Sequence, residues 1–174
     1  MNRINDILKK GIDEFSKSNY SIAEKIFLNL IRSNPLFFPA YTNLIQVFIS
    51  QNKLDEAMKF AKKLFNLDKN SEKGLFFIGI IKFKSKQYSE SLAYFKKALS
   101  INSNNYAVLM NIGITYFRLG DNLKAIQSIK ESIVINNKNE MAYYISPFVI
   151  LGVMLELLFY CKIRTKVYQY SQIE

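Results

Sequence analysis

The main feature of this sequence is a repeat, in which similar segments recur every 34 residues. The segment "SESLAYFKKALSINSNN" (89–105) has a counterpart 34 residues earlier, "DEAMKFAKKLFNLDKNS", and another 34 residues later, "LKAIQSIKESIVINNKN". A fixed period over several units predicts stacked copies of one supersecondary element, since a single short unit cannot bury its apolar face alone. The chain therefore reads as a repeat array and not as an ordinary bundle.

Equivalent positions of the repeat form columns, and two columns define one helix in each unit. The first column holds small residues: Ala23, Ala57, Ser91 and Ala125. Four residues later stand Phe27, Ala61, Phe95 and Ile129. A spacing of 3 or 4 residues places side chains on one helix face. The small column predicts the place where a second helix approaches closely.

A second apolar pattern precedes the first in each unit and predicts the partner helix. It begins at Ile7, Tyr41, Leu75 and Leu109, and four residues further on stand Gly11, Ile45, Gly79 and Gly113. Polar stretches such as "SKSN" and "KSKQ" separate the two helices and are typical of turns. We therefore expect an all-α chain with units at 4–37, 38–71, 72–105 and 106–139, followed by a divergent segment at 140–174.

The four units resemble the tetratricopeptide repeat (TPR) family. The resemblance rests on "YSIAEKIFLNLIRSNP", "LDEAMKFAKKLFNLDKN", "YSESLAYFKKALSINSN" and "NLKAIQSIKESIVINNK". It implies a right-handed superhelical solenoid of helix–turn–helix units, here with an extra C-terminal helix. The departures are the absence of Trp and the polar residues Lys10, Glu14 and Lys82 at places that are apolar in the family.

The resemblance also implies a binding site. In the family, the first helices of successive repeats line a concave groove that holds a peptide. Carried onto this sequence, the groove residues are Lys9, Asn43, Gln46, Lys73, Phe77, Ile80, Lys84, Asn111, Ile114 and Arg118. These positions combine cations with apolar side chains and contain no carboxylate, which favours an acidic peptide with apolar anchors as the partner.

A carboxylate clamp found in one TPR subclass, which binds the C-termini of chaperones, is incomplete here. It would need cationic and amide side chains at Leu8, Ile12, Asn43, Lys73 and Phe77, and only Asn43 and Lys73 fit. A chaperone co-factor role is therefore disfavoured.

The composition of this chain argues against enzymatic catalysis. Histidine is absent and Cys161 is the single cysteine, so the commonest general base and the usual zinc ligands are lacking. No phosphate-binding loop or nucleophile motif occurs, and we expect no enzyme, cofactor or metal. The net charge of +10 favours anionic partners. Nucleic acid is disfavoured, because the lysines are spread over both helices of each unit.

Three interpretations of the divergent segment stay open. Pro147 falls at the helix-interior position of Gly113, so the register fails there. Residues 148–168 could form a capping helix or a helix for self-association. Residues 143–161 are long and apolar enough for membrane contact, against which stand Glu156 and Pro147. The third interpretation is the remnant of a longer chain.

The function predicted from sequence is a non-enzymatic scaffold that binds a peptide or partner protein in the groove of the repeat array. The alternative is a targeting module of, or truncated from, a glycosyl- or sulfotransferase-type enzyme. We expect a cytoplasmic protein, or a membrane-associated one if residues 143–161 are an anchor.

Overall fold

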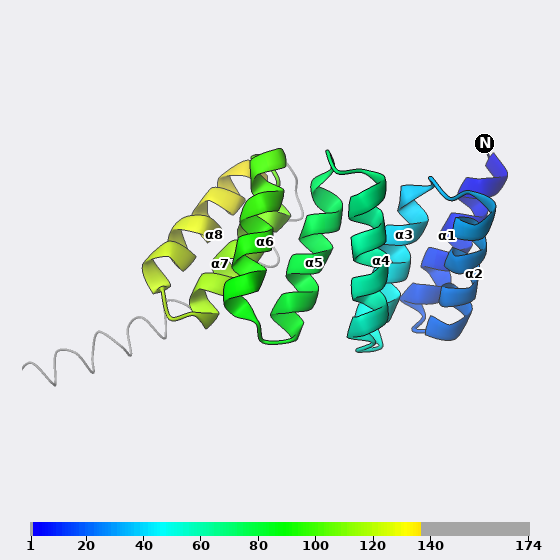
Figure 1. Cartoon of the computed structure of the whole chain (residues 1–174), viewed down its shortest axis with the longest axis horizontal. Coiled ribbons are helices and arrows are strands. Elements are labelled where there is room, and N and C mark those ends of the chain that lie inside the picture. The colour runs from blue at the N-terminus through cyan, green and yellow to red at the C-terminus, as the bar shows by residue number, and fades with distance from the viewer. Residues whose placement is uncertain (1, 137–174) are drawn as a thin grey trace, which may run out of the picture. The chain divides into compact units, whose positions relative to one another are not determined.

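The computed structural model describes residues 2–136, and these form eight α-helices joined by short turns (Figure 1). In chain order the helices are α1 (Asn2–Ser16), α2 (Tyr20–Ser33), α3 (Phe38–Ser50), α4 (Leu54–Leu67), α5 (Glu72–Lys84), α6 (Tyr88–Ile101), α7 (Tyr106–Arg118) and α8 (Asn122–Asn136). The described part of the chain has no strand. The predicted all-α class is therefore confirmed.

The turn inside each helix pair repeats one backbone conformation. Ser18, Asn52, Lys86 and Gly120 occupy one column, and their φ angles are 63°, 58°, 61° and 83°. A left-handed residue just after a helix reverses the chain within three residues. The second helix of each pair therefore runs antiparallel to the first.

The chain divides into two compact units. Unit 1 comprises residues 1–103 and carries α1–α6, and unit 2 begins at residue 104 and carries α7 and α8. In unit 1 each helix packs against the next one along the chain, which is the arrangement of an α-helical solenoid. In unit 2, α7 and α8 pack against each other. The predicted extra helix and the candidate segments within 140–174 lie outside the described residues.

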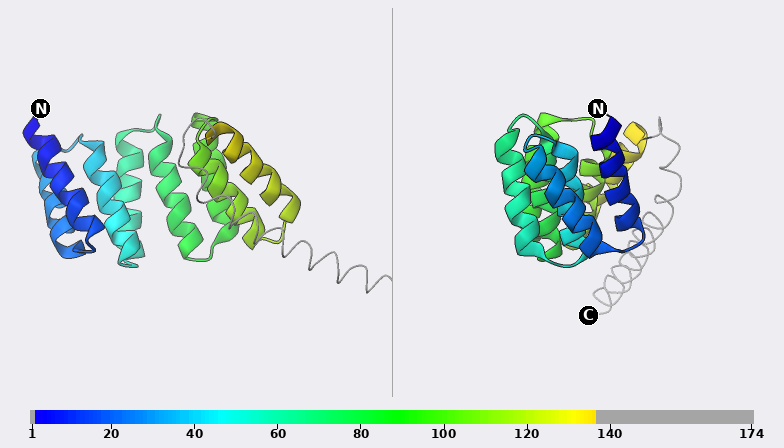
Figure 2. Two further views of the ribbon diagram at one scale, coloured as in Figure 1. Left: turned by 180° about the vertical axis from the view of Figure 1, so that it is seen from behind. Right: turned by 90° about the vertical axis from the view of Figure 1, so that its right-hand side faces the viewer.

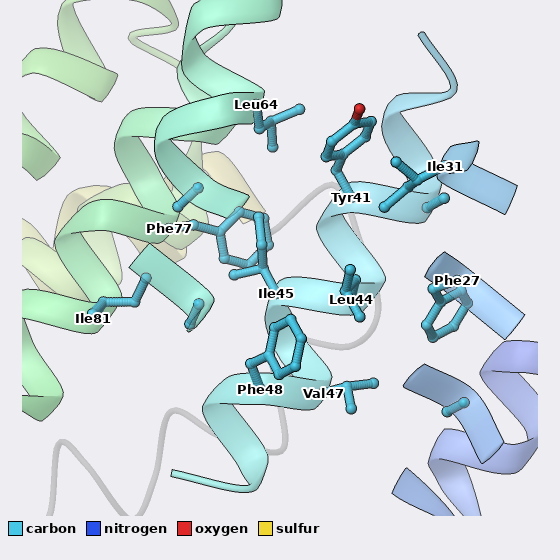
Figure 3. Packing of buried hydrophobic residues seen from close by; sticks show 14 of the residues in the cluster. Phe27, Ile31, Tyr41, Leu44, Ile45, Val47, Phe48, Leu64, Phe77 and Ile81 are labelled. Carbon is cyan, nitrogen blue, oxygen red and sulfur yellow. The ribbon is translucent and has the colours of Figure 1, made fainter. Parts of the chain in front are cut away.

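The core of unit 1 is continuous over its repeats. Tyr41, Leu44 and Ile45 of α3 are fully buried, and α2, α4 and α5 add Phe27, Leu64 and Phe77 to the same cluster (Figure 3). The Tyr41 hydroxyl donates a hydrogen bond of 2.9 Å to the Pro35 carbonyl, so its polar atom is satisfied. One apolar seam therefore joins helix pairs that could not bury these side chains separately.

In three of the four described helix pairs, the two helices meet at a glycine. A Cβ added to Gly11 would lie 2.5 Å from the Phe27 ring, and one added to Gly79 would lie 2.5 Å from the Phe95 ring. In unit 2, a Cβ on Gly113 would lie 2.6 Å from Ile129. No real side chain tolerates such distances, so glycine in the first helix makes room for a large residue in the second.

Candidate functional site

The first helices of the repeats lie side by side along one side of unit 1. Besides their hairpin partners, α1 contacts α3 and α3 contacts α5. The view from behind in Figure 2 shows α1, α3 and α5 in front, whereas α2, α4 and α6 are in front in Figure 1. We call the exposed surface of α1, α3 and α5 the first-helix face.

Several predicted site residues of unit 1 lie at this surface. Lys9, Gln46, Lys73 and Lys84 are exposed, and Ile80 is half-buried. Within the described residues, Lys9, Lys73 and Lys84 form no ion pair. The three lysines therefore keep their charge available to an anionic partner.

Phe77 is not a surface residue, so its assignment to the groove is corrected. It is only 7 % exposed and belongs to the core cluster of unit 1. Figure 3 shows its ring directed toward Ile45 of α3. Its neighbour Phe76 contacts it edge-on at 5.6 Å between ring centroids and is half-buried. A long apolar side chain gains more by turning into the seam than by facing water, so Phe76 and not Phe77 offers an aromatic surface here.

The two predicted asparagines share one local geometry. The Asn43 side-chain amide donates to the Pro39 carbonyl at 2.8 Å, and Asn111 in unit 2 donates to the Ala107 carbonyl at 2.8 Å. Both bonds join a residue to the carbonyl four positions earlier, so the helix itself fixes the amide. The amide oxygen of each side chain can then accept a hydrogen bond from a main-chain N–H of a ligand.

Unit 2 carries the remaining predicted residues on one helix. Asn111 and Ile114 of α7 are half-buried, and Arg118 in its last turn is exposed. These three side chains offer the same combination of amide, aliphatic and cationic groups that unit 1 offers on α3 and α5.

Shifted pKa values occur beside the turns inside two of the helix pairs. The Asn19 amide donates to Glu14 at 2.8 Å and lowers the pKa of that carboxyl. In unit 2, the hydrogen bond from Lys124 lowers the pKa of Asp121, and the same contact raises the pKa of Lys124. These groups support the turns that precede α2 and α8.

Comparison with known proteins decides the family. One sequence model of the tetratricopeptide repeat matches residues 8–69, and another matches residues 73–105 and 106–139. Together these matches cover well over half of the chain. The chain belongs to the tetratricopeptide repeat family.

Similar TPR proteins come from plants and bacteria. The Hsp70-Hsp90 organizing protein 1 of Glycine max is 30 % identical over 80 residues, which are 46 % of this chain and 14 % of that protein. The chain thus spans a small part of this curated relative. The solved structure of pilF of Pseudomonas aeruginosa has a TM-score of 0.71 at 15 % identity, over 93 % of this chain and 72 % of its own. YrrB, described as a TPR protein with an unusual peptide-binding site, has a TM-score of 0.59 at 19 % identity, over 77 % and 69 %.

The described TPR helices contain neither a membrane-spanning helix nor a cluster of metal ligands. Among residues 2–136, no helix is long and apolar enough to cross a membrane. Among the same residues, no group of three His, Cys, Asp or Glu side chains could hold a metal ion. The sequence-based candidates for membrane contact and self-association belong to residues 140–174, outside the described TPR helices.

Proposed function

We propose that this TPR chain is a non-enzymatic scaffold and that the first-helix face of unit 1 holds an acidic peptide with apolar anchors. Membership of the TPR family supports a role in protein–protein interaction. The peptide-binding site named for YrrB and the organizing role named for the Glycine max relative are those proteins' own properties, and both favour this class of function.

The observation that carries the proposal is the pairing of charge and apolar surface on α1 and α5. Lys9, Lys73 and Lys84 are exposed cations, and no acidic side chain in the described residues pairs with them. Ile12 is 40 % exposed, and Phe76 is half-buried. Apolar side chains supply most of the affinity of such a surface, and cations select a carboxylate-rich partner.

Electrostatic recognition can be tested with a synthetic peptide that alternates Glu with Leu and Phe, measured by fluorescence anisotropy. The double variant Lys73→Glu/Lys84→Glu should bind at least about tenfold more weakly, because both cations become repulsive. Binding by the unmodified chain should weaken between ~50 mM and ~500 mM salt, because screening shortens the range of these charges.

A matched control changes the same number of charges on the second helices. Lys25 and Lys59 are exposed residues of α2 and α4, so Lys25→Glu/Lys59→Glu should leave peptide affinity within about twofold if local contacts dominate. A peptide with Gln in place of Glu keeps the apolar anchors, so it should bind the unmodified chain more weakly than the Glu peptide does and should not discriminate between the two double variants. Equal losses in the two double variants would show that net charge, and not the first-helix face, drives binding.

A further inference from the structure

The charges of the second helices in unit 1 are sorted along the helix axes. Asp55 and Glu56 lie in the first turn of α4, and Glu90 lies in the first turn of α6. Lysines follow in the second half of each helix, as the pairs Lys62/Lys63 and Lys96/Lys97. Because α2, α4 and α6 run in one direction, their C-terminal ends meet at one edge of unit 1, the upper edge in Figure 1.

We call this the basic edge and define it by nine side chains. Its cations are Arg32, Lys62, Lys63, Lys69, Lys96 and Lys97, all exposed, and its apolar members are Leu36, Leu67 and Ile101. Two carboxylates also lie there. Asp68 accepts a hydrogen bond from the Asn70 backbone at 3.2 Å, and Glu72 accepts one from the Asn102 amide at 3.2 Å. The cations outnumber these acids, so the edge is positive.

The ion pairs of unit 1 lie at the opposite edge. They join Lys17 to Glu14 at 3.5 Å, Lys53 to Glu24 at 3.3 Å and Lys82 to Glu90 at 2.8 Å. At the basic edge, Arg32, Lys62 and Lys69 form no ion pair within the described residues. The charges of these three cations are therefore not neutralised by ion pairs within the described part of the protein, and they are suited to an external anion.

Aliphatic side chains stand among these cations at the tips of all three repeats. Leu36, in the loop between α2 and α3, is 71 % exposed. Leu67 and Ile101, the last residues of α4 and α6, are 37 % and 41 % exposed. Lysines beside protruding aliphatic groups fit an anionic bilayer, whose headgroups bind the ammonium groups and whose boundary accepts short apolar side chains. Nucleic acid would instead favour arginines and aromatic rings that stack on bases.

We propose that the basic edge of unit 1 docks on an anionic membrane surface. The lysines contact lipid phosphates and carboxylates, while Leu36, Leu67 and Ile101 enter the headgroup region. This attachment is peripheral. It uses side chains other than those of the first-helix face, so it can be tested independently of peptide binding.

The test is co-sedimentation of the full chain with vesicles. Vesicles of phosphatidylcholine containing about one third phosphatidylserine should retain the protein, and pure phosphatidylcholine vesicles should retain much less. Lys62→Glu/Lys69→Glu should weaken binding to the anionic vesicles at least about tenfold, since each cation near such a surface contributes a severalfold effect. Leu36→Ser, at the most exposed aliphatic position, should weaken vesicle binding about threefold or more without lowering the thermal midpoint.

The matched control is Lys84→Glu/Lys86→Glu, which makes the same charge change at the opposite edge, around the α5–α6 turn. It should keep vesicle binding within about threefold. Binding that is equal on both vesicle types, or unaffected by Lys62→Glu/Lys69→Glu, would overturn the proposal. Retention of a random-sequence oligonucleotide at lower protein concentration than anionic vesicles, insensitive to Leu36→Ser, would overturn it in favour of nucleic acid.

Discussion

The left-handed position in the turn of each helix pair is occupied by a different residue in each of the four repeats. Ser18, Asn52, Lys86 and Gly120 all adopt positive φ, yet only the last is glycine. A left-handed conformation costs an ordinary L-residue roughly 1–2 kcal/mol, whereas Gly and, to a lesser degree, Asn adopt it readily. The turn geometry is thus imposed by packing of the two helices and not by the turn residue itself.

This cost gives a prediction for a single side chain. Lys86 is exposed, so Lys86→Gly should raise the free energy of unfolding by about 0.5–1 kcal/mol after the extra backbone entropy of glycine is subtracted. Asn52→Gly is the control and should gain less, because Asn tolerates the conformation better. Urea denaturation followed by circular dichroism measures both. Equal gains at the two positions would contradict this explanation.

The columns of the repeat predict the position of a residue along its helix better than they predict whether its side chain is buried or exposed. Phe77 shares a column with Asn43 and Asn111, which are half-buried, but its ring lies in the core. An amide gains by staying near water and an aromatic ring gains by leaving it, so one column can hold both outcomes. The repeat period thus places the predicted groove residues on the first helices, where their role in binding stays a prediction, whereas the burial of Phe77 depends on the nature of its own side chain.

At the scale of two packed helices, the second repeat reverses the size order of the others. In the first, third and fourth repeats a glycine faces Phe27, Phe95 or Ile129, whereas the second repeat has Ile45 and Ala61 at these two positions. Both residues are fully buried. The pair thus keeps a similar total volume while the large residue moves from the second helix to the first.

This exchange predicts strong coupling between the two positions. Ile45→Gly alone should destabilise by at least about 3 kcal/mol, through a cavity and a helical glycine, and Ala61→Phe alone by about 1–3 kcal/mol through overpacking. The double variant restores the glycine–phenylalanine pairing of the first and third repeats, so it should recover about 1–3 kcal/mol relative to the sum of the single changes. Chemical denaturation of the unmodified chain, the two single variants and the double variant measures this coupling. Strictly additive changes in the free energy of unfolding would contradict the interpretation.

Helix α1 keeps the 34-residue repeat but carries charged residues at positions that are apolar in α3. Asp6, Lys10 and Asp13 of α1 are exposed and charged, whereas the same columns hold Ala40, Leu44 and Val47 in α3, all fully buried. The period alone identifies these positions as equivalent. Their polarity indicates that this face of α1 is solvated, which the pattern of the sequence already contains. Leu36 shares its column with Asn70 and Asn104, so the period places it between two repeats, whereas its exposure among the cations of the basic edge follows only from the structure.

At the scale of the whole molecule, charge is the property with the widest consequence. The chain carries 24 Lys and Arg against 14 Asp and Glu, and the described residues form only four ion pairs. The members of these pairs are largely or partly exposed, so each pair contributes little to stability. Repulsion among the excess cations opposes the compact state, because folding brings them closer together than they are in the unfolded chain.

Salt should therefore stabilise this protein. Raising NaCl from ~10 mM to ~300 mM shortens the screening length from about 30 Å to well under 10 Å, which weakens repulsion between distant lysines more than attraction within the four short pairs. We expect the thermal midpoint to rise by a few degrees over this range, measured by circular dichroism at neutral pH. Lys62→Glu/Lys69→Glu lowers the net charge from +10 by four, so this variant should show a smaller rise than the unmodified chain. A thermal midpoint that falls with salt would mean that attraction within the ion pairs is stronger than repulsion among the excess cations. This result would contradict the prediction.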